Sequence, residues 1–157
     1  MARPNLTLIE KLRQAAKNLE SGDHYNWGHV SHCNCGHLAR CLTDFSAEDI
    51  YRAADASLLT EWSEYANDYC PLDGAPIDNV IDTMIAHGLT TKDIQELEYL
   101  SNRAVLEALP GGYRSLRRGD RASVALYMRT WAALMELELK AATPARKSTT
   151  RELPVGV

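Results

Sequence analysis

The stretch that decides the fold reads PIDNVIDTMIAHG, from Pro76 to Gly88. Its apolar residues recur at spacings of three and four, which places them on one stripe of a helix: Ile77, Val80, Ile81, Met84 and Ile85. The proline in the first turn and the His-Gly pair at the end are typical of helix termini. We therefore expect an amphipathic helix that buries one face.

The same apolar spacing recurs on both sides of this segment. Ser46 with Asp49 and Thr90 with Asp93 have the spacing of capping boxes, and Asp120 can cap the last helix. The helices expected in this way cover residues 7–20, 35–42, 46–68, 76–87, 90–109 and 120–139, with a break near residues 101–102. The predicted architecture is an all-α, compact, single-domain bundle of about six helices.

Two segments fall outside this helical pattern. Residues 23–34 are rich in histidine and aromatic side chains and have no clean period, which predicts an irregular loop. Residues 143–157 are rich in Pro, Ser, Thr and basic residues and predict a flexible tail after a domain of residues 1–142. No alternating apolar run favours a strand.

Composition bounds the class of protein. A chain of 157 residues with 45% hydrophobic and 24% charged residues is typical of one globular domain. The net charge of −4 gives no general reason to expect nucleic acid as a partner. The amino terminus lacks the apolar core of a signal peptide, and no segment has the roughly 20 apolar residues of a membrane span. These features predict a cytoplasmic protein whose cysteines are thiols or metal ligands.

The segment HVSHCNCGHLARC, residues 29–41, carries most of the chemistry. Thiolates and imidazoles are the ligands that zinc and softer transition metals prefer. We predict a metal site formed by Cys33, Cys35, His37 or another nearby histidine, and the distant Cys70, with zinc as the first choice and an iron–sulfur cluster as the second. The sequence leaves open whether such a site is structural or catalytic.

Two alternatives use the same segment. In the first, Cys33 or Cys35 is a reactive thiolate, because a helix N-terminus lowers a thiol pKa, with a nearby histidine as base. Gly36 would then allow close backbone approach of a substrate. In the second, the chain is a helical interaction module whose cysteines only pack.

Further candidates lie outside this segment. Four arginines before and at the start of the last helix form a candidate site for a small anion such as phosphate: Arg114, Arg117, Arg118 and Arg121. Tyr25 and Trp27 interrupt the polar loop, where we expect them to line the site or to anchor the loop. Nothing in the pattern specifies an oligomeric state.

Overall fold

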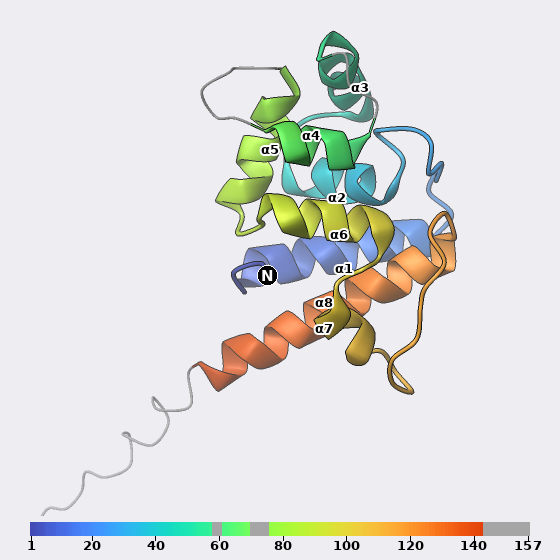
Figure 1. Cartoon of the computed structure of the whole chain (residues 1–157), viewed down its shortest axis with the longest axis vertical. Coiled ribbons are helices and arrows are strands. Elements are labelled where there is room, and N and C mark those ends of the chain that lie inside the picture. Colours follow the sequence, from blue (N-terminus) through green and yellow to red (C-terminus); the bar gives the residue numbers. More distant parts are fainter. Residues whose placement is uncertain (58–60, 70–75, 143–157) are drawn as a thin grey trace, which may run out of the picture.

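The computed structural model describes residues 1–57, 61–69 and 76–142, and within these residues it is all-α, as expected (Figure 1). Eight helices and no strand lie in the described part, so the expected number of about six is too low. The helices are α1 (Leu6–Glu20), α2 (Asn34–Leu42), α3 (Ala47–Ala56), α4 (Trp62–Asp68), α5 (Pro76–Ala86), α6 (Thr91–Tyr99), α7 (Arg103–Glu107) and α8 (Arg121–Ala141).

Local capping explains most helix starts. The capping boxes at Ser46 and Thr90 and the cap at Asp120 are confirmed. The first helix starts earlier than expected, because Asn5 rather than Thr7 accepts the capping bond, from the Leu8 backbone N–H.

The single helix predicted over residues 46–68 is wrong. It is divided into α3 and α4, which are separate elements although the apolar spacing of three and four runs across both. The break predicted after α6 is confirmed: Leu100 adopts the left-handed conformation with φ of 52° and ends the helix, and α7 follows. The predicted tail lies outside the described residues.

Helices α1 and α8 form the lower layer of the bundle in Figure 1 and lie side by side. They run antiparallel, because Arg13 in the middle of α1 pairs with Glu136 near the end of α8, whereas Glu20 at the end of α1 pairs with Arg129, which comes earlier in α8. Their facing stripes are fully buried. Other helices pack against this antiparallel pair.

Helix α2 contacts both α1 and α6, and α3, α4 and α5 lie toward the top of Figure 1. The apolar stripe identified from Ile77 to Met84 faces the core, since these side chains are almost completely buried. The loop of residues 21–33 runs along the edge of the layers and ends at Cys33, the N-cap of α2.

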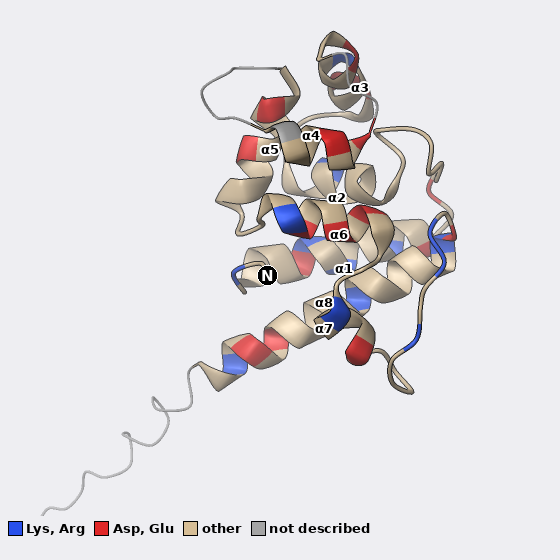
Figure 2. Ribbon diagram, in the orientation of Figure 1, with Lys and Arg blue, Asp and Glu red and all other residues tan. Residues whose placement is uncertain are grey.

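Charged residues are spread along the helices, and basic residues mark the connection between α7 and α8 (Figure 2). No described helix is both long enough and apolar enough to cross a membrane.

Candidate functional site

The N-terminus of α2 docks on the C-terminus of α6 through one buried side chain, Asn34. Its amide nitrogen donates to the backbone oxygens of Leu97 at 3.1 Å and Glu98 at 3.0 Å, and its oxygen accepts from the Tyr25 hydroxyl at 2.7 Å. The last carbonyls of a helix have no partner within the helix, so Asn34 satisfies two of them. This contact brings the cysteines of α2 against the acidic end of α6.

Cys33 and Cys35 are both buried at this junction, with 1% and 0% of their surfaces exposed. The Cys33 thiol lies 3.6 Å from the backbone oxygen of Val30, and the Cys35 thiol lies 3.2 Å from that of Ile94. The sequence therefore placed these two residues correctly at a helix N-terminus, and the structure brings them together beside one carboxyl group.

That carboxyl group belongs to Glu98, which is only 5% exposed. The backbone N–H of Cys35 and the thiols of Cys35 and Cys33 lie within hydrogen-bonding reach of it, yet its Oε2 atom has no hydrogen-bond partner. Burial raises the pKa of Glu98, the donors from the two cysteines oppose that shift, and the negative charge of Glu61 adds to it. A buried carboxyl group with an unsatisfied oxygen is unusual and marks a functional candidate.

The two thiols hold their protons more strongly than free cysteine does. Burial raises the pKa of Cys33 and of Cys35 well above the ordinary value, and the nearby charge of Glu98 raises both further. Backbone N–H groups at the start of α2 lower the pKa of Cys33, but burial outweighs them. The direction of both shifts is opposite to the one expected from the helix N-terminus, so the reactive-thiolate alternative stays a prediction without support from these pKa values.

A cavity of about 170 Å³ opens onto this cluster. Cys33 and Glu98 line it from α2 and α6, and Trp62 lines it from α4. Trp27 from the loop and Tyr99 from the end of α6 complete its aromatic wall, and Glu61 adds a second carboxylate. The indole N–H of Trp62 donates to the Val30 backbone oxygen at 2.9 Å, which fixes this ring against the loop. Trp27 thus lines the candidate site, whereas Tyr25 anchors the loop through Asn34.

Close contact with the backbone of residues 30–31 requires a glycine at position 36. A Cβ atom on Gly36 would lie 2.4 Å from the backbone oxygen of Val30 and 2.5 Å from the carbonyl carbon of Ser31. The backbone of residues 30–31, rather than a substrate, makes the close approach to Gly36 in this structure.

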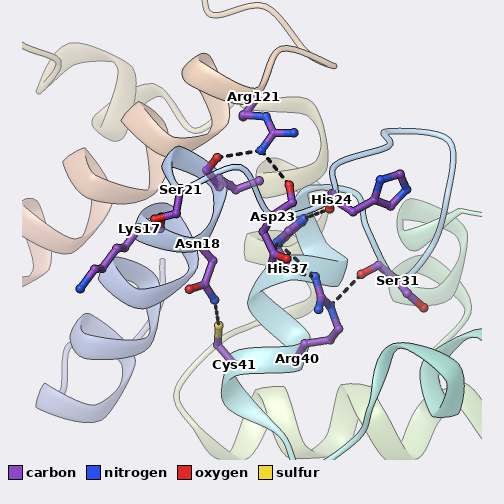
Figure 3. Close-up of polar contacts among 11 residues, drawn as sticks. Lys17, Asn18, Ser21, Asp23, His24, Ser31, His37, Arg40, Cys41 and Arg121 are labelled. Carbon is purple, nitrogen blue, oxygen red and sulfur yellow. Dashed lines mark hydrogen bonds and ion pairs between the residues drawn. The ribbon is translucent and has the colours of Figure 1, made fainter.

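His37 is engaged elsewhere (Figure 3). Its Nε2 lies 2.8 Å from the backbone oxygen of His24, and its Nδ1 lies 3.3 Å from the Arg40 guanidinium and 4.0 Å from the Asp23 carboxylate. Burial lowers the pKa of His37, so the ring is neutral, with Nε2–H as donor and Nδ1 as acceptor. A metal could bind His37 only by displacing one of these partners.

The other histidines of the loop gather around His32. Its ring centroid lies 4.6 Å from that of His24 and 4.9 Å from that of His29, and its Nδ1 atom is buried without a partner. Burial lowers the pKa of His32 to about 4, with smaller contributions from Arg40 and the neighbouring imidazoles. As the side chains stand, no three His, Cys, Asp or Glu residues in the described part of the chain are placed to hold a metal ion.

The two remaining cysteines differ from this pair. Cys70 lies outside the described residues. Cys41 is half-buried near α1, with its sulfur 3.8 Å from the Asn18 amide nitrogen (Figure 3). It is a natural control for experiments on Cys33 and Cys35.

The arginines proposed as an anion site have partners within the chain. Arg121 donates to the backbone oxygens of Leu19 and Asp23 at 2.8 and 2.7 Å, and Arg114 donates to that of Pro110 at 2.9 Å. Arg118 lies over two aromatic rings rather than beside the other guanidinium groups. Anion binding stays a prediction without support from these contacts.

Glu98 is the functional candidate that sequence reasoning missed, and a signal for it exists. It lies four residues after Ile94 on α6, so the helical period places it on the apolar face beside Leu97. A carboxylate on a buried stripe is the pattern to look for.

Comparison with known proteins adds no assignment. No protein-family model matches the chain, and neither the curated proteins nor the solved structures contain a match.

Proposed function

We propose that this protein binds a transition metal ion, zinc first and an iron–sulfur cluster second, at the junction of α2 and α6. The thiols of Cys33 and Cys35 are the first two ligands. The carboxyl group of Glu98 is an additional oxygen ligand, and Cys70 is the candidate for a further thiolate.

The observation that carries this proposal is the convergence of two buried thiols on one buried carboxyl group whose Oε2 atom lacks a partner. Thiolate and carboxylate are both ligands of zinc. In apolar surroundings the ionisation of each of these three acids is disfavoured, because a charge without a nearby opposite charge is costly to bury. A divalent cation supplies that charge and so lowers all three pKa values together.

Ligand binding requires only side-chain rotation at the cysteines. The sulfurs of Cys33 and Cys35 are directed to the carbonyls of Val30 and Ile94, and those contacts are weak thiol hydrogen bonds. Glu98 replaces His37 in the proposed set, because both ring nitrogens of His37 already have partners.

A zinc titration tests the ligand set. At neutral pH, binding should release about two to three protons per zinc ion, because the buried acids ionise as the metal binds. Cys33→Ser, Cys35→Ser and Glu98→Gln should each weaken zinc binding, measured by competition with a chromophoric chelator, and Cys70→Ser tests the ligand that lies outside the described residues. Cys41→Ser is the matched control and should leave affinity unchanged. Equal affinity in all five variants would refute the proposal.

A second candidate function is proton transfer by a thiol–carboxyl pair. It is favoured by one observation, that Cys33 and Glu98 line the same cavity. A carboxyl group with a raised pKa can serve as a general base for a thiol near neutral pH. The raised pKa of Cys33 works against this function, and rapid alkylation of Cys33 near pH 7 would favour it over metal binding.

A further inference from the structure

We infer that the cavity at the end of α6 binds a small organic cation, an alkylammonium or guanidinium group. The juxtaposition that assigns it is an aromatic wall of Trp27, Trp62 and Tyr99 with the carboxyl groups of Glu61 and Glu98.

The aromatic wall supplies the first attraction. The face of an aromatic ring is negative and attracts a cation within about 6 Å of its centre, most strongly when water is excluded. Trp62 is 1% exposed and is held by its bond to Val30, so one wall is rigid and dry. Trp27 is 38% exposed and forms the rim through which a ligand can enter.

Glu98 supplies the second attraction. Its Oε2 atom is buried and has no hydrogen-bond partner, which leaves an acceptor free for an N–H group or for the charge of a quaternary ammonium. Glu61 is exposed and faces Glu98 closely enough to raise its pKa. A bound cation would offset this effect of Glu61 and favour the ionised form of Glu98.

The guanidinium group of Arg118 already makes the kind of cation–aromatic contact that we propose for the ligand. Its guanidinium carbon lies 4.8 Å from the centre of the Tyr99 ring and 5.6 Å from that of Trp27, two of the rings that line the cavity. Arg118 itself does not line the cavity. A guanidinium group is therefore already attracted to two of the rings that line the cavity, and the acceptor of Glu98 remains for a second cation.

Size limits the ligand to a head group. A cavity of about 170 Å³ is smaller than the roughly 300–1,000 Å³ of pockets for drug-sized molecules. The cation is therefore either a small molecule or the end of a side chain from a protein partner.

Calorimetric titration with choline, and with its neutral isostere 3,3-dimethylbutan-1-ol, tests the inference. Choline should bind at least about tenfold more tightly, since the two differ in charge and not in shape. An acetylated trimethyllysine amide distinguishes a free small molecule from the side chain of a protein partner. If it binds more tightly than choline, the cationic group belongs to a protein partner. Equal binding of choline and the neutral isostere would overturn the inference.

Three variants locate the binding site. Glu98→Gln should weaken choline binding about tenfold, because it replaces the buried carboxyl group next to the cation by a neutral amide. Trp27→Ala should weaken it similarly and, because Trp27 is at the exposed rim, the fold should be retained. Arg118→Gln should strengthen binding by removing the internal competitor. Weaker binding in Arg118→Gln, or unchanged binding in Glu98→Gln, would contradict the assignment.

Matched controls keep this inference separate from metal binding. Glu48→Gln removes an exposed carboxylate that pairs with Arg52 on α3 and should leave choline affinity unchanged. The titration is run on the protein as purified and again after treatment with a chelator. Binding of choline after chelation supports the proposed cation site whether or not the metal proposal holds. A protein that does not bind zinc but binds choline would refute only the metal proposal.

Discussion

Gly36→Ala should destabilise the protein, because the structure leaves no space for a side chain at this position. Gly36 lies in the first turn of α2, where a new Cβ atom would meet the Val30 backbone oxygen at 2.4 Å and the Ser31 carbonyl carbon at 2.5 Å. Carbon and oxygen atoms that are not bonded to each other approach to about 3.3 Å at the closest. Loop 30–31 would therefore have to move by about 1 Å.

Each carbonyl of that loop is held by a partner. The Trp62 indole donates to Val30 at 2.9 Å, and the Arg40 Nε donates to Ser31 at 3.0 Å. Overpacking costs about 1–3 kcal/mol. The two strained hydrogen bonds add about 0.5–1.5 kcal/mol each. The higher helix propensity of alanine returns about 1 kcal/mol. The expected net loss in the free energy of unfolding is about 2–4 kcal/mol.

Thermal and urea unfolding followed by circular dichroism would measure this loss. For a domain of this size it corresponds to a fall in Tm of roughly 5–15 °C. Gly28→Ala is the control, because the nearest atom to a Cβ there is the Asn26 side-chain oxygen at 3.5 Å, an ordinary contact. A Gly36→Ala protein as stable as the Gly28→Ala protein would refute the claim that loop 30–31 is clamped on α2.

Three further predictions concern the same region. Asn34→Ala should lower the free energy of unfolding by about 2–3 kcal/mol in urea titrations, because it removes two buried hydrogen bonds to the end of α6, and of the two carbonyls only that of Leu97 keeps a bond, from the Leu100 N–H; a loss below about 0.5 kcal/mol would contradict the docking described here. The folded-state pKa of His32, about 4, is below the ordinary value of 6.5. Stability from this group is therefore present above pH 6.5 and lost as the pH falls toward 4, and His32→Gln should unfold with a weaker dependence on pH in that window; identical pH profiles would exclude His32 as the cause. Iodoacetamide should react slowly with Cys33 and Cys35 near pH 7 in the folded protein, because burial raises both pKa values, and fast labelling followed by mass spectrometry would show that one of them is a thiolate.

Sequence patterns predict the helix ends well where residues close in sequence determine them. The capping boxes at Ser46 and Thr90 need only a hydroxyl and a carboxylate three residues apart, so the sequence alone identifies them. The division between α3 and α4 has no such marker, because the apolar spacing of three and four continues from Tyr51 to Trp62 and beyond.

The candidate site depends on contacts between elements that are distant in sequence. Cys33 and Cys35 are conspicuous in the sequence, but only the docking of Asn34 on α6 shows that Glu98 is their neighbour. The direction of the thiol pKa shift depends on the same long-range contacts. The lowering by a helix N-terminus can be predicted from the local sequence, but the raising by burial cannot. In the sequence His37 is as good a candidate ligand as the cysteines, but the structure shows that both of its ring nitrogens have partners.

The measurement that tests the central claim most directly is the metal content of the full chain purified without an affinity tag. Elemental analysis should find close to one equivalent of zinc per chain, or iron with visible charge-transfer absorption. Cys41→Ser should retain the metal, and Cys33→Ser and Cys35→Ser should lose it together with part of their thermal stability, because metal bound only by the folded state stabilises it. A colourless protein that is stable, contains no metal and gains no stability from added zinc would contradict the claim.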